Sequence, residues 1–86
     1  MKITAEVSLY PLKTTDVTPA IVEFIDYMRA AGLEVQPGRL STLVTGESAA
    51  VFAALQAAYE QSCRQGAAVL VVKAANIGPP QSEGNQ

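Results

Sequence analysis

The sequence contains no histidine and only one cysteine among its 86 residues. The absence of histidine removes the commonest proton shuttle and metal ligand of proteins. Cys63 cannot form a disulfide within the chain, and its place in an apolar helical pattern predicts a packed side chain, not a nucleophile. The spacing of Asp16, Glu23 and Asp26 is not that of metal ligands. These features argue against a metal site and against histidine-dependent catalysis.

Long hydrophobic runs are also absent. The longest, residues 67–72, ends at Lys73 and falls far short of the roughly 18 residues needed to cross a bilayer. Residues 3–9 alternate apolar and polar side chains, which is not the pattern of a secretory signal. We therefore expect a soluble cytoplasmic protein. The six basic residues are scattered and the net charge is −2, so nucleic acid is not an expected partner.

The hydrophobic periodicity predicts six elements in the order strand, helix, strand, strand, helix, strand. Thr18 is the expected N-cap of the first helix, and Gly32 and Gly66 are the expected stops of the two helices. The predicted elements are strand 2–10, helix 19–31, strands 33–35 and 40–46, a helix from just after Gly46 to about residue 65, and strand 67–75. This order predicts a ferredoxin-like βαββαβ sandwich of the α+β class, with a four-stranded antiparallel sheet and both helices on one face.

A chain of this length forms one domain, which we place at residues 1–77. Residues 78–86 are glycine, proline and polar residues without an apolar anchor, a composition that predicts a disordered C-terminal tail.

The last predicted strand is apolar on both faces. Val69 and Val71 share one parity, whereas Leu70 and Val72 share the other. In a sheet with helices on one side only, the uncovered face is normally polar. We therefore expect this open face to pack against another copy, giving a homo-oligomer. The alternative is that the apolar strand is simply tolerated or is covered by the tail.

Three hydroxyl residues, Ser41, Thr42 and Thr45, lie in the third predicted strand. The ordinary explanation is that threonine favours strands and that a solvated face needs polar residues. The other explanation is a binding surface, because the first strand places Glu6 and Tyr10 on one face beside them. Hydroxyls, a carboxylate and an aromatic ring suit a small polar heteroaromatic ligand.

Several segments resemble the small thiamine/hydroxymethylpyrimidine-binding family of ferredoxin-like proteins. The strongest are Ile3-Thr-Ala-Glu-Val-Ser-Leu-Tyr-Pro-Leu12 and Ser41-Thr-Leu-Val-Thr-Gly-Glu47, and the resemblance covers roughly residues 1–77. It implies non-enzymatic binding of thiamine or its pyrimidine moiety, no cofactor, and association into dimers or tetramers through the sheets. By motif position, the resemblance implies these ligand-binding residues: Glu6, Ser8, Tyr10, Thr42, Thr45 and, more weakly, Asn76.

Other functions stay open at this point. Glu6 and Lys73 form the only plausible acid–base pair, and a cross-strand ion pair explains them better than catalysis, so we do not expect an enzyme. The alternative function is a metabolite-sensing regulatory module that binds another small ligand, such as an amino acid, at subunit interfaces. A structural subunit without a ligand is the third possibility.

Overall fold

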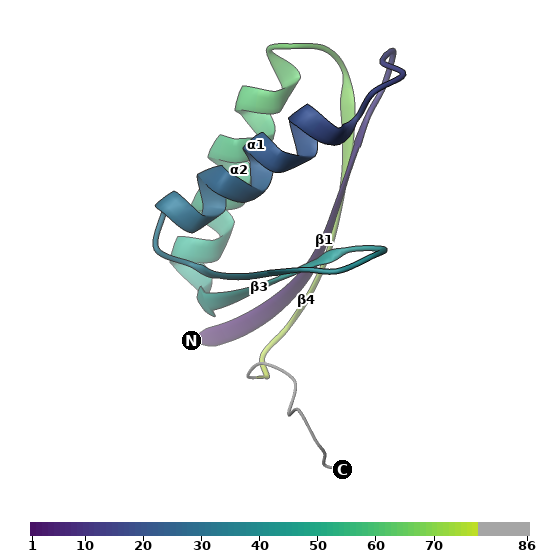
Figure 1. Ribbon diagram of the computed structural model, residues 1–86. Coiled ribbons are helices and arrows are strands. Elements are labelled where there is room, and N and C mark those ends of the chain that lie inside the picture. Colours follow the sequence, from purple (N-terminus) through teal and green to yellow (C-terminus); the bar gives the residue numbers. More distant parts are fainter. Residues whose placement is uncertain (78–86) are drawn as a thin grey trace.

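The computed structural model describes residues 1–77, so the tail predicted at residues 78–86 lies outside the described part. Four antiparallel strands form one sheet in the order β2-β3-β1-β4. Both helices cover the same face of this sheet (Figure 1). The elements are β1 (Lys2–Pro11), α1 (Thr18–Ala30), β2 (Glu34–Pro37), β3 (Thr42–Glu47), α2 (Ser48–Cys63) and β4 (Ala68–Ala75). The predicted βαββαβ ferredoxin-like fold is therefore confirmed.

The core lies between the helices and the sheet, and β1 supplies its centre. The predicted alternation along β1 is confirmed, because its odd-numbered residues from Ile3 to Leu9 are buried beneath the helices and its even-numbered residues face the open side. Met28 of α1, Val44 of β3 and Val51 of α2 complete the core and are fully enclosed. None of the helices described between residues 1 and 77 is long and apolar enough to span a membrane.

The start of α1 differs from the prediction. Thr18 is already helical, and the N-cap residue Val17 makes no side-chain capping bond. Instead, a carboxylate oxygen of Asp16 accepts the Thr18 amide at 3.2 Å. The predicted threonine cap is wrong because this carboxylate, two residues earlier, satisfies the amide that remains free at a helix start. At the other end the stop is as predicted, since Gly32 has a φ of 86°.

The end of α2 also differs. The helix ends at Cys63 instead of near residue 65, and the chain turns before Gly66. Cys63 is exposed, so the prediction of a packed cysteine is wrong. The apolar pattern that suggested burial continues only to Ala58, the last buried residue of the helix.

The hairpin between the helices is shifted toward the C-terminus relative to the prediction. Strand β2 spans Glu34–Pro37 instead of 33–35, and β3 begins at Thr42 instead of at residue 40. The amide of Gly38 donates to the carbonyl of Ser41 at 2.8 Å, which closes a tight turn. Leu40 lies at the tip of this turn and is 92% exposed. The late start of β3 shortens its pairing with β1.

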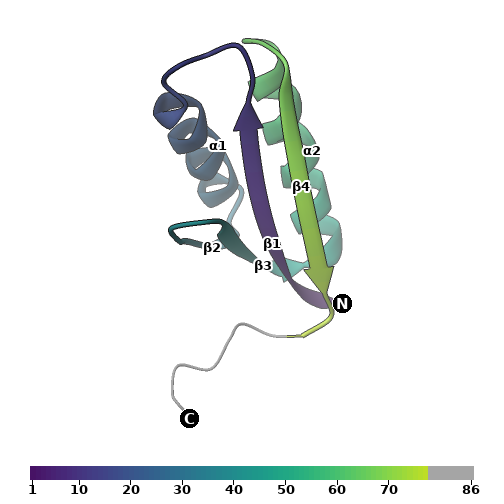
Figure 2. The ribbon, with the colours of Figure 1, turned by 90° about the vertical axis from the view of Figure 1, so that its right-hand side faces the viewer.

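The open face of the sheet carries apolar side chains, as the sequence indicated. Val69 and Val71 lie on it and are each 46% exposed in the single chain. Figure 2 views the sheet from this side, with the helices behind it. Packing of this face against a second copy stays a prediction.

Candidate functional site

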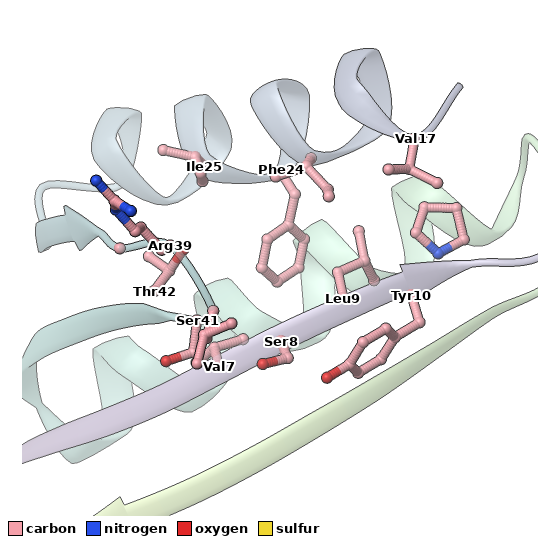
Figure 3. Close-up of a pocket in the computed structure, with 14 residues that line it drawn as sticks. Val7, Ser8, Leu9, Tyr10, Val17, Phe24, Ile25, Arg39, Ser41 and Thr42 are labelled. Carbon is pink, nitrogen blue, oxygen red and sulfur yellow. The ribbon is translucent and has the colours of Figure 1, made fainter. Parts of the chain in front are cut away.

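A cavity of about 330 Å³ opens where β3 stops short of the end of β1. The register between these strands ends at the Val7–Thr42 pair, whereas β1 continues to Pro11 alongside β4. Residues 7–11 form one wall, α1 forms the second and residues 38–42 form the third. In Figure 3 the ring of Phe24 points from α1 into the space above β1. The lining is mainly apolar, with hydroxyl groups at its border.

The backbone of Leu9 faces this cavity without a strand partner. The Ser48 amide donates to the carbonyl of Met1, the residue before β1, at 2.8 Å and continues the β1–β3 register, so the odd-numbered residues of β1 direct their amides and carbonyls toward β3. Leu9 would meet residue 40, but the pairing has already ended at Val7. Leu9 therefore offers one amide donor and one carbonyl acceptor, side by side, to whatever occupies the gap.

A second, smaller hollow of about 260 Å³ lies on the open face of the sheet. It is lined by Glu6, Ser8, Tyr10, Leu40, Ser41, Val71 and Lys73. Four of these residues also line the cavity: Ser8, Tyr10, Leu40 and Ser41. The two spaces therefore adjoin at the end of β1 and the turn after β2, and we call them the helix-side cavity and the open-face hollow.

Glu6 is the charged centre of the open-face hollow. The Ser41 hydroxyl donates to its Oε2 at 2.9 Å, and the Lys73 ammonium lies 3.2 Å from its Oε1. The predicted cross-strand ion pair is thus confirmed, since Glu6 and Lys73 are direct partners in the sheet register. The hydroxyl of Ser41, and after it the ammonium of Lys73, lower the pKa of Glu6 below its ordinary value. The carboxylate therefore stays ionised at neutral pH.

Removing the hydroxyl with Ser41→Ala should raise the pKa of Glu6 toward its ordinary value, because the Ser41 bond is the larger cause of the lowering. A carbon-detected NMR titration of the Glu6 carboxyl measures this directly, and Lys73→Met should also raise the pKa, because it removes both a hydrogen bond and a positive charge. Since the folded-state pKa is the lower one, the network stabilises the fold above the ordinary glutamate pKa, and this contribution is lost as the pH falls through the folded-state pKa. An unchanged titration in Ser41→Ala would contradict the assignment.

The structure brings together half of the residues that the sequence suggested. Glu6, Ser8 and Tyr10 line the open-face hollow. Thr42 pairs with Val7, lies on the helix side and borders the cavity. Thr45 is on the open side but is buried.

Thr45 and Asn76 lie at the opposite end of the sheet from Tyr10. The hydroxyls of Thr45 and Thr4 are 3.4 Å apart, and Thr4 also donates to the carbonyl of Ile77, the residue after Asn76. Neither Thr45 nor Asn76 lines the cavity or the hollow. In this arrangement the Thr45 hydroxyl links β3 to β1, and a ligand role for Thr45 and Asn76 stays a prediction.

Sequence reasoning missed two contributors to the site, the Phe24 ring and the unpaired Leu9 backbone, and it named the Ser41 hydroxyl in a possible binding surface without including it among the ligand-binding residues. Phe24 belongs to the helical apolar pattern and looks like any core residue. The Leu9 backbone becomes available only because β3 starts late. Ser41 belongs to the hydroxyl-rich segment. It lies two residues before Leu43, which pairs with Glu6, and this shared face was the signal that could have identified it. Within residues 1–77, no group of three acidic or cysteine side chains could hold a metal ion.

Comparison with known proteins identifies relatives of the whole domain. Three solved structures of similar fold are a hypothetical protein from Methanocaldococcus jannascii, a protein from Streptococcus pneumoniae and a Thermotoga maritima protein described as "a putative thiamine biosynthesis/salvage protein". Their identities to this chain are 22%, 21% and 16%, with TM-scores of 0.81, 0.81 and 0.82. The alignments cover 99%, 95% and 94% of this chain and 87%, 92% and 91% of theirs. At these identities the similarity establishes the fold.

No curated protein matches the sequence. The model of the YKOF-related family matches residues 2–82, which is nearly the full length of the chain. A match of this extent includes both helices, all four strands and the residues around the cavity. The chain therefore belongs to the YKOF-related family.

Proposed function

We propose that this protein binds thiamine, or its hydroxymethylpyrimidine moiety, in the helix-side cavity without changing it chemically. The observation that carries the proposal is the gap beside β1, where an apolar cavity with an aromatic wall meets the unpaired amide and carbonyl of Leu9. The Thermotoga maritima protein of the same fold, described in terms of thiamine biosynthesis or salvage, supports this choice of ligand.

The chemistry of an aminopyrimidine matches the gap. Its ring nitrogen accepts a hydrogen bond and its adjacent exocyclic amine donates one, which complements the amide and carbonyl of a free strand edge. The flat ring suits the apolar space between Leu9 and Phe24, because aromatic rings pack well against aromatic and aliphatic walls. At about 330 Å³ the cavity falls at the lower end of the usual range for small-molecule sites.

The adjoining hollow suits the other half of thiamine. Its thiazolium ring carries a positive charge, and the ionised carboxylate of Glu6 lies next to the residues that separate the two spaces. The Tyr10 ring, 52% exposed, is available there as an aromatic surface for a cation. We therefore place the pyrimidine in the cavity and the thiazolium toward Glu6.

The groups that are present support binding without reaction. The hollow holds one carboxylate, which is already bonded to Ser41 and Lys73. General acid–base catalysis needs a group whose pKa lies near the working pH, whereas the pKa of Glu6 is moved further from neutrality.

Isothermal titration calorimetry with thiamine, hydroxymethylpyrimidine and a panel of amino acids tests the proposal. Both thiamine and the pyrimidine should bind, and saturation at 100 times the dissociation constant should stabilise the fold by about 2.7 kcal/mol. If neither releases heat up to millimolar concentration, the ligand assignment is wrong. Heat with an amino acid alone would favour the regulatory module.

A further inference from the structure

A third hollow lies beside the turn of the β2–β3 hairpin, and we call it the hairpin hollow. Its volume is about 450 Å³, and its lining includes Gln36 of β2, Leu43 of β3 and Arg39 of the turn. Glu6 and Ser41 line both this hollow and the open-face hollow. The two hollows therefore adjoin at Glu6, and the binding mode proposed above leaves the hairpin hollow without an occupant.

The strand register places four residues in one row across the open face. Leu43 of β3 pairs with Gln36 on one side and with Glu6 on the other. Glu6 pairs in turn with Lys73. Neighbouring strands lie about 4.8 Å apart, so the backbones of Gln36 and Glu6 are separated by roughly 10 Å. The row thus leads from a carboxylate, over an apolar side chain, to an amide.

Lys73 ends the row on the side away from the hairpin hollow. Its ammonium lies 3.2 Å from the Glu6 carboxylate and neutralises it. Lys73 lines the open-face hollow but not the hairpin hollow. An anion in the hairpin hollow would therefore need a different cation.

Arg39 supplies that cation. It is the only basic residue among the described residues that line the hairpin hollow. Within residues 1–77 its guanidinium takes part in no ion pair. In Figure 3 this guanidinium lies on the far side of Ser41 and Thr42 from Tyr10. A guanidinium binds a phosphate through two parallel hydrogen bonds, so Arg39 is free to hold such a group.

The groups around Glu6 are arranged to suit a phosphorylated thiamine. In the complex proposed above the thiazolium ring lies toward Glu6, and this ring carries a two-carbon arm whose terminal oxygen can bear a phosphate. From Glu6 the row leads over Leu43, whose side chain suits the methylene groups of the arm. Beyond it, the Gln36 amide and the Arg39 guanidinium are hydrogen-bond donors for phosphate oxygens. Cation, spacer and anion thus meet carboxylate, leucine and guanidinium in the same order.

We propose that the hairpin hollow is the subsite for the phosphate of a phosphorylated thiamine, with Arg39 as its main ligand and Gln36 as a second donor. The subsite rests on the thiamine binding proposed above, and it adds the ligand class, phosphate esters of the two-carbon arm. Glu6 repels the phosphate little because Lys73 neutralises it. Glu34, two residues before Gln36 on the same face, does not line the hollow.

Calorimetry on the unaltered protein with thiamine and thiamine monophosphate tests the subsite. The monophosphate should bind at least about tenfold more tightly, the effect of one hydrogen-bonded ion pair. This preference should shrink as salt is added, because exposed charges are screened. Equal affinities, or tighter binding of thiamine, would overturn the subsite and leave the proposed function standing. If neither compound binds, and hydroxymethylpyrimidine does not bind either, both proposals fail.

Arg39→Gln should remove most of the tenfold preference by weakening the monophosphate much more than thiamine. This difference separates a phosphate contact from a structural role, which would weaken both ligands. Arg64→Gln is the matched control, because Arg64 lies outside the cavity and both hollows, and it should change neither affinity. Gln36→Ala should reduce the preference in the same direction but by less. Equal losses for the two ligands in Arg39→Gln would overturn the assignment.

Hydroxymethylpyrimidine phosphate tests where the anion binds. Its phosphate takes the place of the thiazolium ring and would meet Glu6, so it should bind no more tightly than hydroxymethylpyrimidine. Arg39 also lines the helix-side cavity. Tighter binding of this compound that disappears in Arg39→Gln would place the anion at the wall of the cavity and overturn the subsite in the hairpin hollow.

Discussion

Phe24→Ala is expected to lower the free energy of unfolding by about 3–5 kcal/mol, the range for removing a buried phenylalanine ring. The side chain is 5% exposed and packs between α1 and the sheet. Domains typically have a total stability of about 5–15 kcal/mol, so the variant should lose a substantial fraction of its stability. Urea denaturation followed by circular dichroism measures the change.

Phe52→Ala is the matched control, because it is the same substitution in the other helix at a side chain that is 51% exposed. It should cost about 1 kcal/mol or less, since half of the ring is already in water. Equal losses for the two variants would contradict the packing described for α1. Phe24→Leu separates stability from binding, because it keeps most of the volume and should weaken ligand binding more than it weakens the fold.

Glu6→Gln is expected to weaken thiamine binding by more than about tenfold, equivalent to about 1.4 kcal/mol, because the carboxylate faces the positive ring in the proposed complex. The loss has a second cause in the same network. Without the carboxylate, the Lys73 ammonium has no counter-charge and would repel the cation. Hydroxymethylpyrimidine carries no fixed positive charge, so its affinity should change much less. Calorimetry with both ligands measures the difference.

Two variants control for this effect. Glu34→Gln removes a carboxylate from the same side of the sheet, on β2 and outside both the cavity and the hollow, and should leave binding unchanged. Lys73→Met removes the competing cation and should preserve or improve thiamine binding. If Glu6→Gln weakens both ligands equally, the thiazolium does not face Glu6 and the placement of the two rings is wrong.

The fold could be predicted because its signals are local. Alternation along residues 2–10 and the helical spacing of Phe24, Ile25 and Met28 each report which side of an element is buried. Gly32 marks the end of α1 because the chain needs a positive φ there. Strand ends could not be predicted as well, because β3 begins where the Gly38–Ser41 bond closes a turn, and this depends on pairing across the hairpin.

The candidate site was predictable only where it follows the period of a strand. Glu6, Ser8 and Tyr10 share a face because they are two residues apart, and that face is the open one. The cavity behind them depends on the difference in length between β1 and β3, which leaves no trace in composition or periodicity. Thr45 shows what the pattern of hydroxyls leaves out, since its hydroxyl lies 3.4 Å from that of Thr4 on β1, a contact that depends on strand register.

Because the cavity exists only where β3 does not extend beside β1, the length of the β2–β3 hairpin decides whether this fold has a binding cavity. Two more residues in each arm of the β2–β3 hairpin would preserve the side-chain alternation and place a residue of β3 opposite Leu9. Backbone hydrogen bonds between β3 and Leu9 would then close the cavity. Insertions in surface turns cost little stability. A ferredoxin-like domain could therefore gain or lose a binding cavity by changing one turn, while its buried residues stay the same.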